Sequence, residues 1–508
     1  MIRQEKYNKI NCTGCGEFTQ ADLVAFDFSK IFMEVVQEET VDSMWVMLGR
    51  LDLGFYYTIR DICQELHYSM NRRKPTKLRL TVKDVIEQIE FLLDDISFDK
   101  LKTENRHSVL YNQLYEKIQS TYGTAEEEMD AIERLIRNLA TSDKNLEILS
   151  VDIQIEMVTD EGGREMPTEL FYYIHGEKRE LKERVCPLCG MPMDSQAGYR
   201  NEYIIGLAGL ARVGKTALIA SLIHQLRQLE EMDYIHIKSE ASESLQKFQD
   251  EVVAEYESGN IIRKTEVENV DNIPLVYVPV QIGSRECNFI FVDMPGEIYT
   301  GSEEAGLDFI SNKRTIMKNA DVVWCCVEPS MFDERFKNAH AEAKADDVSR
   351  QLSDLVRVLN MIYNTKIPAS IVVTQSDIIK DAKLFRPQED VMHEYLLEDH
   401  SLDWDKTKAF VEETRHFVDR LNNFKVSIED TFEGLSMFGV ASYGFDVTTK
   451  ALITSQTIHP SMVELPFLWT LAVLDLIPVT RSSTAKSLLG KEKVVTEKIG
   501  DTKELYLD

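Results

Sequence analysis

The stretch Gly209-Leu-Ala-Arg-Val-Gly-Lys215-Thr216 decides the fold of this chain. It fits the pattern G-x-x-x-x-G-K-[ST], in which glycines allow a tight turn whose backbone N–H groups converge on a phosphate. We expect Lys215 to contact the terminal phosphates of a nucleotide and the Thr216 hydroxyl to bind Mg²⁺. The residues predicted to bind the phosphates are Gly209, Leu210, Ala211, Arg212, Val213, Gly214, Lys215, Thr216 and Ala217.

The neighbouring sequence supplies the context that such a loop needs. The apolar run Tyr203–Ala208 precedes it and predicts a strand. The segment Lys215–Leu229 follows it with apolar residues at the helical period, so the positive end of a helix dipole would point at the phosphates. A fortuitous glycine-rich turn would require neither element, and the context therefore favours phosphate binding.

Strand and helix patterns alternate from about residue 198 onward. Strands are predicted at Tyr203–Ala208, Leu275–Ile282, Asn288–Asp293, Asp321–Val327, Ala369–Thr374 and Ser436–Ala441, and helices at Lys215–Leu229, Val348–Ile362, Lys406–Asn422 and Val463–Leu476. This order predicts an α/β domain with a mostly parallel sheet and helices on both faces. The connector after Ile282 is too short for a parallel crossover, so one antiparallel hairpin is expected.

A strand-terminal carboxylate follows in the sequence Asp293-Met-Pro-Gly296. Asp293 could hold Mg²⁺ beside the phosphate loop, and the Gly296 N–H could contact the γ-phosphate. Asp-x-Pro-Gly is also ordinary turn chemistry, and only its place after the phosphate loop favours the functional interpretation. The next residue, Glu297, could accept a hydrogen bond from an attacking water, or it could be a solvated loop carboxylate.

Two later segments could recognise a base. Thr374-Gln375-Ser-Asp377 ends an apolar strand, and the Asp377 carboxylate could accept both edge donors of guanine, which adenine lacks. The stem of Gln375 could lie over the base. After the last strand, Ala441, Ser442 and Tyr443 could bring a backbone N–H to guanine O6.

Thr265 could complete the Mg²⁺ site when a γ-phosphate is present. It is the only Thr between Thr216 and Asp293, and it lies in the expected interval. An ordinary loop Thr explains the same observation equally well. The predicted catalytic residues are Lys215, Thr265 and Glu297, and the predicted Mg²⁺ ligands are Thr216, Thr265 and Asp293.

Two C-x-x-C pairs, each followed by Gly, occur far apart in the chain. Four thiolates in a tetrahedral array form a closed structural zinc site, and the residues predicted to form it are Cys12, Cys15, Cys186 and Cys189. The strand before Cys12 would then pair with the strand before Cys186. Two redox pairs or an iron–sulfur site are alternatives, although neither pair opens a helix after a strand.

Composition and charge limit the possible partners. The 508 residues carry a formal net charge of −29, which argues against a general nucleic-acid coat because phosphate backbones require clustered Lys and Arg. No secretory leader, lipid signal or membrane-length apolar run is visible, so we expect a cytoplasmic protein without membrane contact.

The segments divide the chain into four expected parts. These are a split zinc ribbon (1–16 and 149–197), a mainly helical insertion (17–148), a P-loop GTPase domain (198–480) and a polar tail (481–508).

Gly209–Thr216, Asp293–Gly296, Thr374–Asp377 and Ala441–Tyr443 occur in the order of a Ras-like GTPase domain of the TRAFAC type, which this part of the chain resembles. A cysteine turn just before the phosphate loop is similar to the GTPases of bacterial GTPase-centred conflict systems, including double-GTPase families. The resemblance implies a regulatory GTPase that acts with protein partners in anti-phage defence. The expected contact regions are the helical insertion and the loops around Thr265 and Gly296.

The leading hypothesis is therefore a Mg²⁺-dependent GTP-binding and GTP-hydrolysing switch. Ala211, Arg212 and Glu297 depart from the small-GTPase pattern and suggest slow turnover under a partner's control. An ATP-hydrolysing signalling protein and a nucleotide-binding scaffold without significant hydrolysis remain alternatives.

Overall fold

The computed structural model divides into two compact units, Gln4–Tyr199 and Arg200–Asp508, with the first three residues shared between them. The described residues are 9–12, 18–20, 25–27, 30–31, 34, 77–84, 86–87, 139, 141–159, 165–186, 188, 191–193, 197, 200–229, 233–238, 243–260, 262, 275–294, 296, 317–331, 345–363, 367–378, 391–419, 422–444, 458–486, 492–500 and 502–506.

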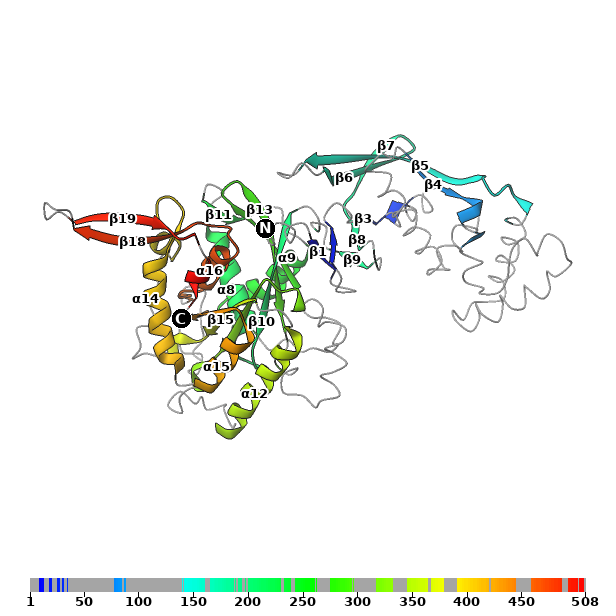
Figure 1. The fold of residues 1–508 in the computed structure, drawn as a ribbon. Coiled ribbons are helices and arrows are strands. Elements are labelled where there is room, and N and C mark those ends of the chain that lie inside the picture. Colours follow the sequence, from blue (N-terminus) through cyan, green and yellow to red (C-terminus); the bar gives the residue numbers. More distant parts are fainter. Residues whose placement is uncertain are drawn as a thin grey trace. The chain divides into compact units, whose positions relative to one another are not determined.

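A seven-stranded sheet forms the centre of the second unit (Figure 1). Its strand order is β11 (Ile235–Ile237), β12 (Leu275–Ile282), β13 (Arg285–Asp293), β10 (Asn201–Ala208), β14 (Val322–Val327), β15 (Pro368–Val373) and β17 (Gly434–Gly439). The five strands from β13 to β17 run parallel, whereas β12 pairs antiparallel with both β13 and β11. The predicted fold class and its hairpin are confirmed, and the short edge strand β11 is an addition.

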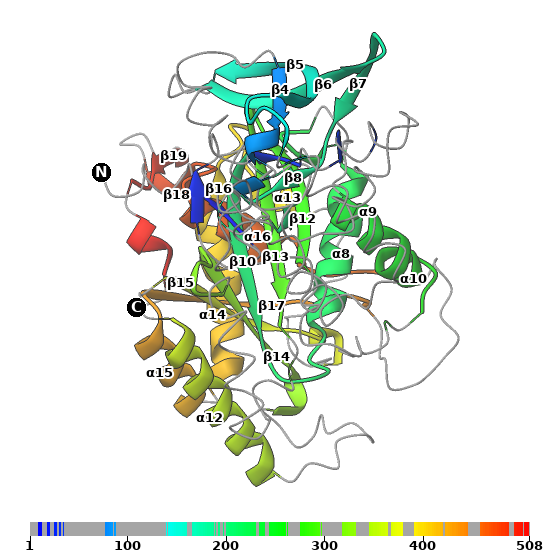
Figure 2. The ribbon, with the colours of Figure 1, turned by 90° about the vertical axis from the view of Figure 1, so that its right-hand side faces the viewer.

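Helices cover both faces of this sheet. On one face α16 (Leu465–Val473) packs through Phe467 against Phe289 and Phe291 of β13. On the other face Gly206 of β10 lies against Tyr363, which follows α12 (Ala345–Ile362). Figure 2 shows α8 (Lys215–Gln228) beside α9 (Glu243–Phe248) and α10 (Ala254–Glu257), away from α12 and α15 (Asn422–Thr431).

The apolar composition of α16 explains its position. All nine of its residues are buried, and each large aliphatic or aromatic side chain removed from water contributes about 1.5–3 kcal/mol to folding. The helix predicted at Val463–Leu476 is thus present, in shortened form. Within the described residues, no helix has both the length and the apolar character needed to cross a membrane.

The helix predicted at Lys406–Asn422 is present but ends at Val418, and Asn422 begins a second helix. The first, α14 (Trp404–Val418), begins where the Asp403 carboxylate accepts a hydrogen bond from the Lys406 N–H at 3.2 Å, as an N-cap does. It ends before the separate helix α15.

The last segment of the chain, expected to be a polar tail, contains regular secondary structure. Strand β18 (Val479–Lys486) crosses the expected boundary at residue 480 and forms an antiparallel hairpin with β19 (Glu492–Lys498). A short helix, η11 (Thr502–Leu505), follows, and its Leu505 carbonyl accepts a hydrogen bond from the Trp469 indole. Backbone pairing, rather than apolar alternation, therefore defines this region.

The first unit contains sheets of its own. Strands β5 (Glu147–Thr159), β6 (Glu165–Ile174) and β7 (Glu177–Leu181) form an antiparallel meander that also includes β4 (Lys77–Thr81). β4 lies within the expected helical insertion, most of which falls outside the described residues.

The expected pairing of the strands before the two cysteine turns is wrong. β1 (Lys9–Asn11) pairs with β2 (Phe18–Gln20), while β8 (Arg184–Val185) pairs with β3 (Ala25–Phe26) and β9 (Pro192–Met193). Each strand before a cysteine turn is thus paired with the strand that follows that turn, because a short connection favours a hairpin.

Candidate nucleotide site

The phosphate loop connects β10 to α8, and its backbone needs glycine at one end. Gly209 has φ +155°, and a Cβ atom there would lie 2.6 Å from the Cys326 carbonyl oxygen of the neighbouring strand β14. Gly214, at the start of α8, also has a left-handed φ of +86°. Arg212 has φ +67°, and both Ala211 and Arg212 are exposed. The loop therefore turns sharply, with Ala211 and Arg212 exposed and Leu210 and Val213 buried.

The Lys215 ammonium group lies across this loop. Lys215 is buried, and its Nζ donates hydrogen bonds to the carbonyl oxygens of Gly209 at 3.0 Å and Leu210 at 3.2 Å. A buried ammonium is stable only when its donors find acceptors, and here the loop carbonyls provide them. An incoming phosphate would offer the same donors an anionic acceptor.

Thr216 and Asp293 lie next to each other although they are far apart in sequence. Strands β10 and β13 are neighbours with Leu207 opposite Asp293, which brings the end of β13 to the start of α8. The Thr216 hydroxyl donates to the Asp293 carboxylate at 2.5 Å. Burial raises the pKa of Asp293, while Lys215 and the Thr216 hydrogen bond oppose that rise. A buried carboxylate and a hydroxyl are oxygen ligands of the kind that Mg²⁺ requires, so the residues fit that ion.

The chain beyond Asp293 lies directly on the phosphate loop. A Cβ atom on Gly296 would fall 1.9 Å from the Ala211 nitrogen and 2.2 Å from the Leu210 carbonyl carbon, so no side chain fits at this position. The predicted residues Thr265 and Glu297 lie outside the described residues.

Thr374 joins the phosphate loop to the sheet. Its single hydroxyl proton is shared between the carbonyl oxygens of Val213, at 2.5 Å from Oγ1, and Val327, at 3.1 Å. Because Val213 belongs to the loop and Val327 ends β14, a single side chain connects the two. This bond explains why a polar residue follows the apolar strand β15.

The other members of the Thr374–Asp377 segment are also fixed in place. Gln375 has a left-handed φ of +53°, and its Nε2 lies 3.9 Å from the position that a Cβ on Gly214 would occupy. The Ser376 N–H donates to the Val440 carbonyl at 3.0 Å, and Asp377 is buried. The segment is therefore held between the phosphate loop and the residues that follow β17.

The loop after β17 is hydrogen-bonded to other parts of the chain. Ala441 and Ser461 exchange two backbone hydrogen bonds at 3.0 and 2.8 Å, so the Ala441 N–H already has an acceptor within the protein. The Ser442 carbonyl accepts a hydrogen bond from the Tyr256 hydroxyl, and the Tyr443 side chain is buried. Tyr256 lies in no recognised motif, and the sequence analysis missed it.

The two predicted cysteine turns are only partly described. Cys12 and Cys186 are buried, and the Leu188 N–H points at the Cys186 sulfur at 3.4 Å, whereas Cys15 and Cys189 lie outside the described residues. Ile10, beside Cys12, shares a small apolar cluster with Ala197 and Met193. Within the described part of the chain, no group of three or more potential metal ligands is present.

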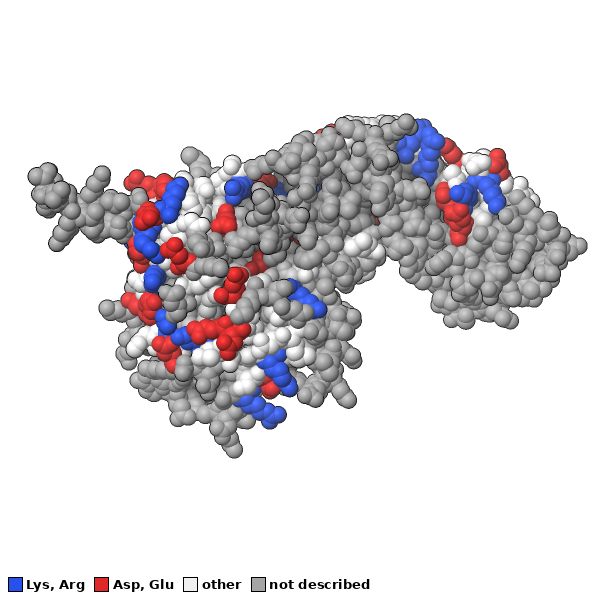
Figure 3. All heavy atoms as spheres, in the orientation of Figure 1, with Lys and Arg blue, Asp and Glu red and all other residues white. Residues whose placement is uncertain are grey.

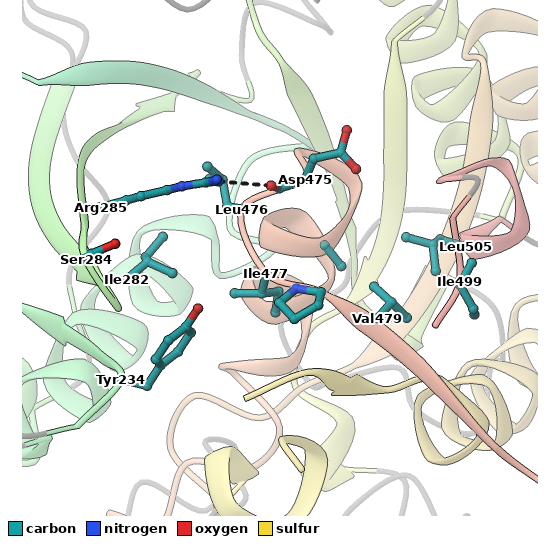
Figure 4. A pocket seen from close by; sticks show the side chains of 12 residues that line it. Tyr234, Ile282, Ser284, Arg285, Asp475, Leu476, Ile477, Val479, Ile499 and Leu505 are labelled. Carbon is teal, nitrogen blue, oxygen red and sulfur yellow. Dashed lines mark hydrogen bonds between the residues drawn. The ribbon is translucent and has the colours of Figure 1, made fainter. Parts of the chain in front are cut away.

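A separate cavity of about 420 Å³ lies at the other end of β13, roughly 25 Å along the strand from Asp293 (Figure 4). Its lining includes Tyr234, Arg285 and Ile477, and the Arg285 guanidinium donates to the Asp475 carbonyl at 3.4 Å. None of the predicted nucleotide-binding residues lines it.

Surface charge is mixed on the face drawn in Figure 3, where acidic and basic side chains alternate along the edge formed by α14. On this face no continuous basic surface is formed by the residues that the structure describes.

Residues 203–426 match a protein-family model described as Double-GTPase 2. This part of the chain is a P-loop GTPase domain of the double-GTPase type. The matched range of the GTPase domain contains Gly209–Thr216, Asp293–Gly296 and Thr374–Asp377. It ends before Ala441–Tyr443 and does not include the cysteine turns.

Some solved structures are also similar to this chain, at low sequence identity. Crystal structures of two variants of SsGBP are 11% and 10% identical over 48% and 47% of this chain, with TM-scores of 0.23 and 0.22. The chain spans half the length of each. A signal recognition particle receptor SRb-GTP/SRX complex from Chaetomium thermophilum is 13% identical over 48% of this chain and 92% of that one, with a TM-score of 0.24. No curated protein matches the chain.

Proposed function

We propose that the chain is a Mg²⁺-dependent GTP-binding and GTP-hydrolysing regulatory switch. The observation that carries this proposal is the contact between Thr216 and Asp293 beside the buried Lys215. These three side chains provide a hydroxyl, a carboxylate and an ammonium at one end of the parallel strands. When bound there, Mg²⁺ would neutralise charge between the terminal phosphates.

The choice of guanine is proposed for Asp377. Asp377 is buried at the end of β15, beside the phosphate loop, so a base that offers its carboxylate no donors would leave it unmatched at a high cost. Gln375 supports the same assignment because its amide lies close to Gly214. A backbone N–H from Ser442 or Tyr443 would complete the base contacts, since that of Ala441 is already bonded to Ser461.

Slow turnover under a partner's control is proposed from the residues that surround the phosphates. Ala211 and Arg212 are exposed on the outer side of the loop, where they can crowd a partner's approach to the γ-phosphate. Glu297 follows Gly296 in the sequence and would place a negative charge near an anionic group. The loops around Thr265 and Gly296 would order on GTP and be released when the γ-phosphate is lost.

A single-turnover assay with the full chain tests this function. We expect GTP with Mg²⁺ to be bound and slowly hydrolysed, and chelation of Mg²⁺ to abolish hydrolysis. Hydrolysis of ATP in preference to GTP would identify an ATPase instead. Tight GTP binding with no product after prolonged incubation would support a nucleotide-binding scaffold.

A structural zinc ion is proposed to join the two cysteine turns. The burial of Cys12 and Cys186, the amide directed at the Cys186 sulfur and the cluster of Ile10, Ala197 and Met193 support a common site. Metal analysis of the purified chain should give one equivalent of zinc, and Cys186→Ser should lower that value. Less than half an equivalent in the wild-type chain would oppose the proposal.

The domain division into a split ribbon, an insertion, a GTPase domain and a tail remains a proposal. We further propose that protein partners bind through the insertion and the switch loops, in a defence role of the kind that the resemblance implies.

A further inference from the structure

The cavity at the amino end of β13 is enclosed by segments of the second unit that are far apart in sequence (Figure 4). They are the turn between β12 and β13, the connection from α16 to β18, and the chain that leads from β19 into η11, together with Tyr234. The volume of about 420 Å³ lies within the range of about 300–1,000 Å³ that is usual for small-molecule sites. The cavity is therefore large enough to hold a small organic molecule.

Buried apolar side chains make up much of the lining. Five of them are at most 6% exposed, namely Ile282, Leu476, Ile477, Val479 and Leu505. An apolar group that enters the cavity would leave water, which favours binding. The lining residues with polar side chains are Tyr234, Ser284, Arg285 and Asp475. A mainly apolar surface with a few polar groups is typical of sites for ligands that combine an apolar body with a polar group.

Tyr234 forms a wall of the cavity and is fixed in place. Its ring stacks on that of His400, with centroids 4.2 Å apart and an interplanar angle of 2°. The Tyr234 carbonyl accepts a hydrogen bond from the Gly283 N–H at 2.7 Å, and a Cβ atom on Gly283 would lie 2.6 Å from the tyrosine ring. Because these contacts already hold the ring, a ligand would not have to order it, and binding would lose little conformational entropy there.

Arg285 is the only residue of the lining with a positively charged side chain. It is exposed, and its guanidinium donates a long hydrogen bond of 3.4 Å to the neutral Asp475 carbonyl. In Figure 4 the Asp475 carboxylate points away from Arg285. A guanidinium has several N–H donors in a planar fork, so most of the donors of Arg285 are available to a ligand.

The turn at the end of α16 holds the carbonyl that Arg285 contacts. Asp475 has a left-handed φ of +59°, and its N–H bonds to the Ala472 carbonyl at 3.1 Å. The Leu476 N–H bonds to the Leu471 carbonyl at 2.9 Å, as at other helix ends with a left-handed residue. The carbonyl thus anchors one side of the guanidinium beside the cavity.

We propose that this cavity binds a small carboxylate whose body is apolar. The carboxylate would accept charge-assisted hydrogen bonds from Arg285, because a guanidinium matches the two oxygens of a carboxylate. The apolar body would lie against Ile477 and the ring of Tyr234. A phosphate is a poorer match, since phosphate sites usually gather several donors or a helix N-terminus, whereas α16 meets the cavity with its carboxyl end. No predicted nucleotide-binding residue lines the cavity, so the inference does not depend on the proposed GTPase function.

The probes that test this site are 2-naphthoate and its neutral isostere 2-naphthamide. Ligand-observed NMR titration of the full chain at physiological salt measures both affinities. We expect saturable binding of naphthoate to the wild-type chain, at least about tenfold tighter than that of naphthamide. Arg285→Met keeps an unbranched side chain and removes the charge. It should raise the Kd of naphthoate about tenfold and change that of naphthamide less than about twofold.

Two further variants serve as a graded test and a control. Arg285→Lys should give an intermediate Kd for naphthoate, because Lys keeps the charge but not the planar fork. Arg357→Met removes an exposed arginine of α12 that pairs with Asp354, away from the cavity, and it should bind both probes as the wild-type chain does.

Failure of the wild-type chain to bind naphthoate, equal affinities for the two probes, or an unchanged Kd for naphthoate in Arg285→Met would each overturn the inference. An equal loss in Arg357→Met would also overturn it, because the effect would then come from overall charge. A wild-type chain that binds naphthoate but not GTP would support this site and refute the proposed function.

Discussion

The phosphate side and the base side of the nucleotide site are built differently. On the phosphate side, the polar groups bond to one another or to the loop that they serve: Lys215 to Gly209 and Leu210, and Thr216 to Asp293. On the base side, the connecting bonds run to backbone groups of other elements: Thr374 to Val213 and Val327, and Tyr443 to Asn260 and Ile262.

This difference suggests that the two sides of the site have different roles. The phosphate-side bonds involve groups that a nucleotide and Mg²⁺ would recruit, so those groups should matter most for binding. The base-side bonds hold loops in position, so most changes there should affect stability or the choice between nucleotides. The following variants test that division, in order of decreasing expected effect.

Lys215→Ala should cause the largest loss. Removing a buried ammonium that would make several charge-assisted bonds to phosphate should weaken the binding of GTP and ATP alike by about 1,000-fold. Isothermal titration of the full chain measures both affinities. Lys408→Ala, an exposed position on α14, is the matched control and should behave as wild type. Retained tight GTP binding in Lys215→Ala would contradict the phosphate-loop assignment.

Asp377→Asn should weaken GTP binding by about 100-fold and leave ATP binding almost unchanged, because only the guanine edge donors lose their shared carboxylate. The same titration with both nucleotides measures this change in preference. A variant that keeps the wild-type preference for GTP would show that Asp377 does not recognise the base.

Asp293→Asn should weaken the Mg²⁺ site. The factor by which Mg²⁺ strengthens GTP binding should fall about tenfold relative to the wild-type chain.

Asp293→Asn should also stabilise the nucleotide-free protein at pH 7. The pKa of the Asp293 carboxyl is raised by burial, so the fold favours its protonated form and loses stability as the pH rises through that pKa. The difference in stability between the variant and the wild-type chain should therefore shrink as the pH is lowered from 7. Thermal melts of both proteins at a series of pH values measure this difference. An unchanged advantage at every pH would argue against a titrating Asp293.

Thr374→Val should have the smallest effect on binding and a clear effect on folding. It leaves the Val213 carbonyl without its hydroxyl donor, at a cost of about 1–2 kcal/mol in the free energy of unfolding. Ser370→Ala on the same strand is a suitable control, because the buried Ser370 hydroxyl has no hydrogen-bond partner among the described residues. Denaturant titration of both variants measures the difference. Equal stability of the two variants would show that the bond to Val213 contributes nothing.

The sheet that carries the site was largely predictable from the sequence. The strands β10, β12, β13, β14, β15 and β17 are runs of buried apolar residues, and the motifs occur at the carboxyl ends of β10, β13, β15 and β17. Local periodicity and turn chemistry are sufficient for such elements. The hairpin of β12 and β13 followed from the short connection alone.

Other features could not be predicted from local sequence patterns. β11 is only three residues long and exists because the edge of β12 is available for pairing. β18 and β19 carry many polar residues, so their pairing leaves no alternation to detect. The prediction that β1 pairs with the distant strand before Cys186 was wrong, because β1 pairs with the nearby strand β2. The Tyr443 contacts join segments that are distant in sequence, and no local sequence pattern predicts them.

The central claim is that Lys215, Asp293 and Asp377 together form a guanine nucleotide site. Titration of the wild-type full chain with GTP and with ATP, each with and without Mg²⁺, tests it most directly. The account predicts that GTP binds at least about 100-fold more tightly than ATP and that Mg²⁺ strengthens the binding of GTP. Equal affinities for the two nucleotides, or tighter binding of ATP, would contradict it.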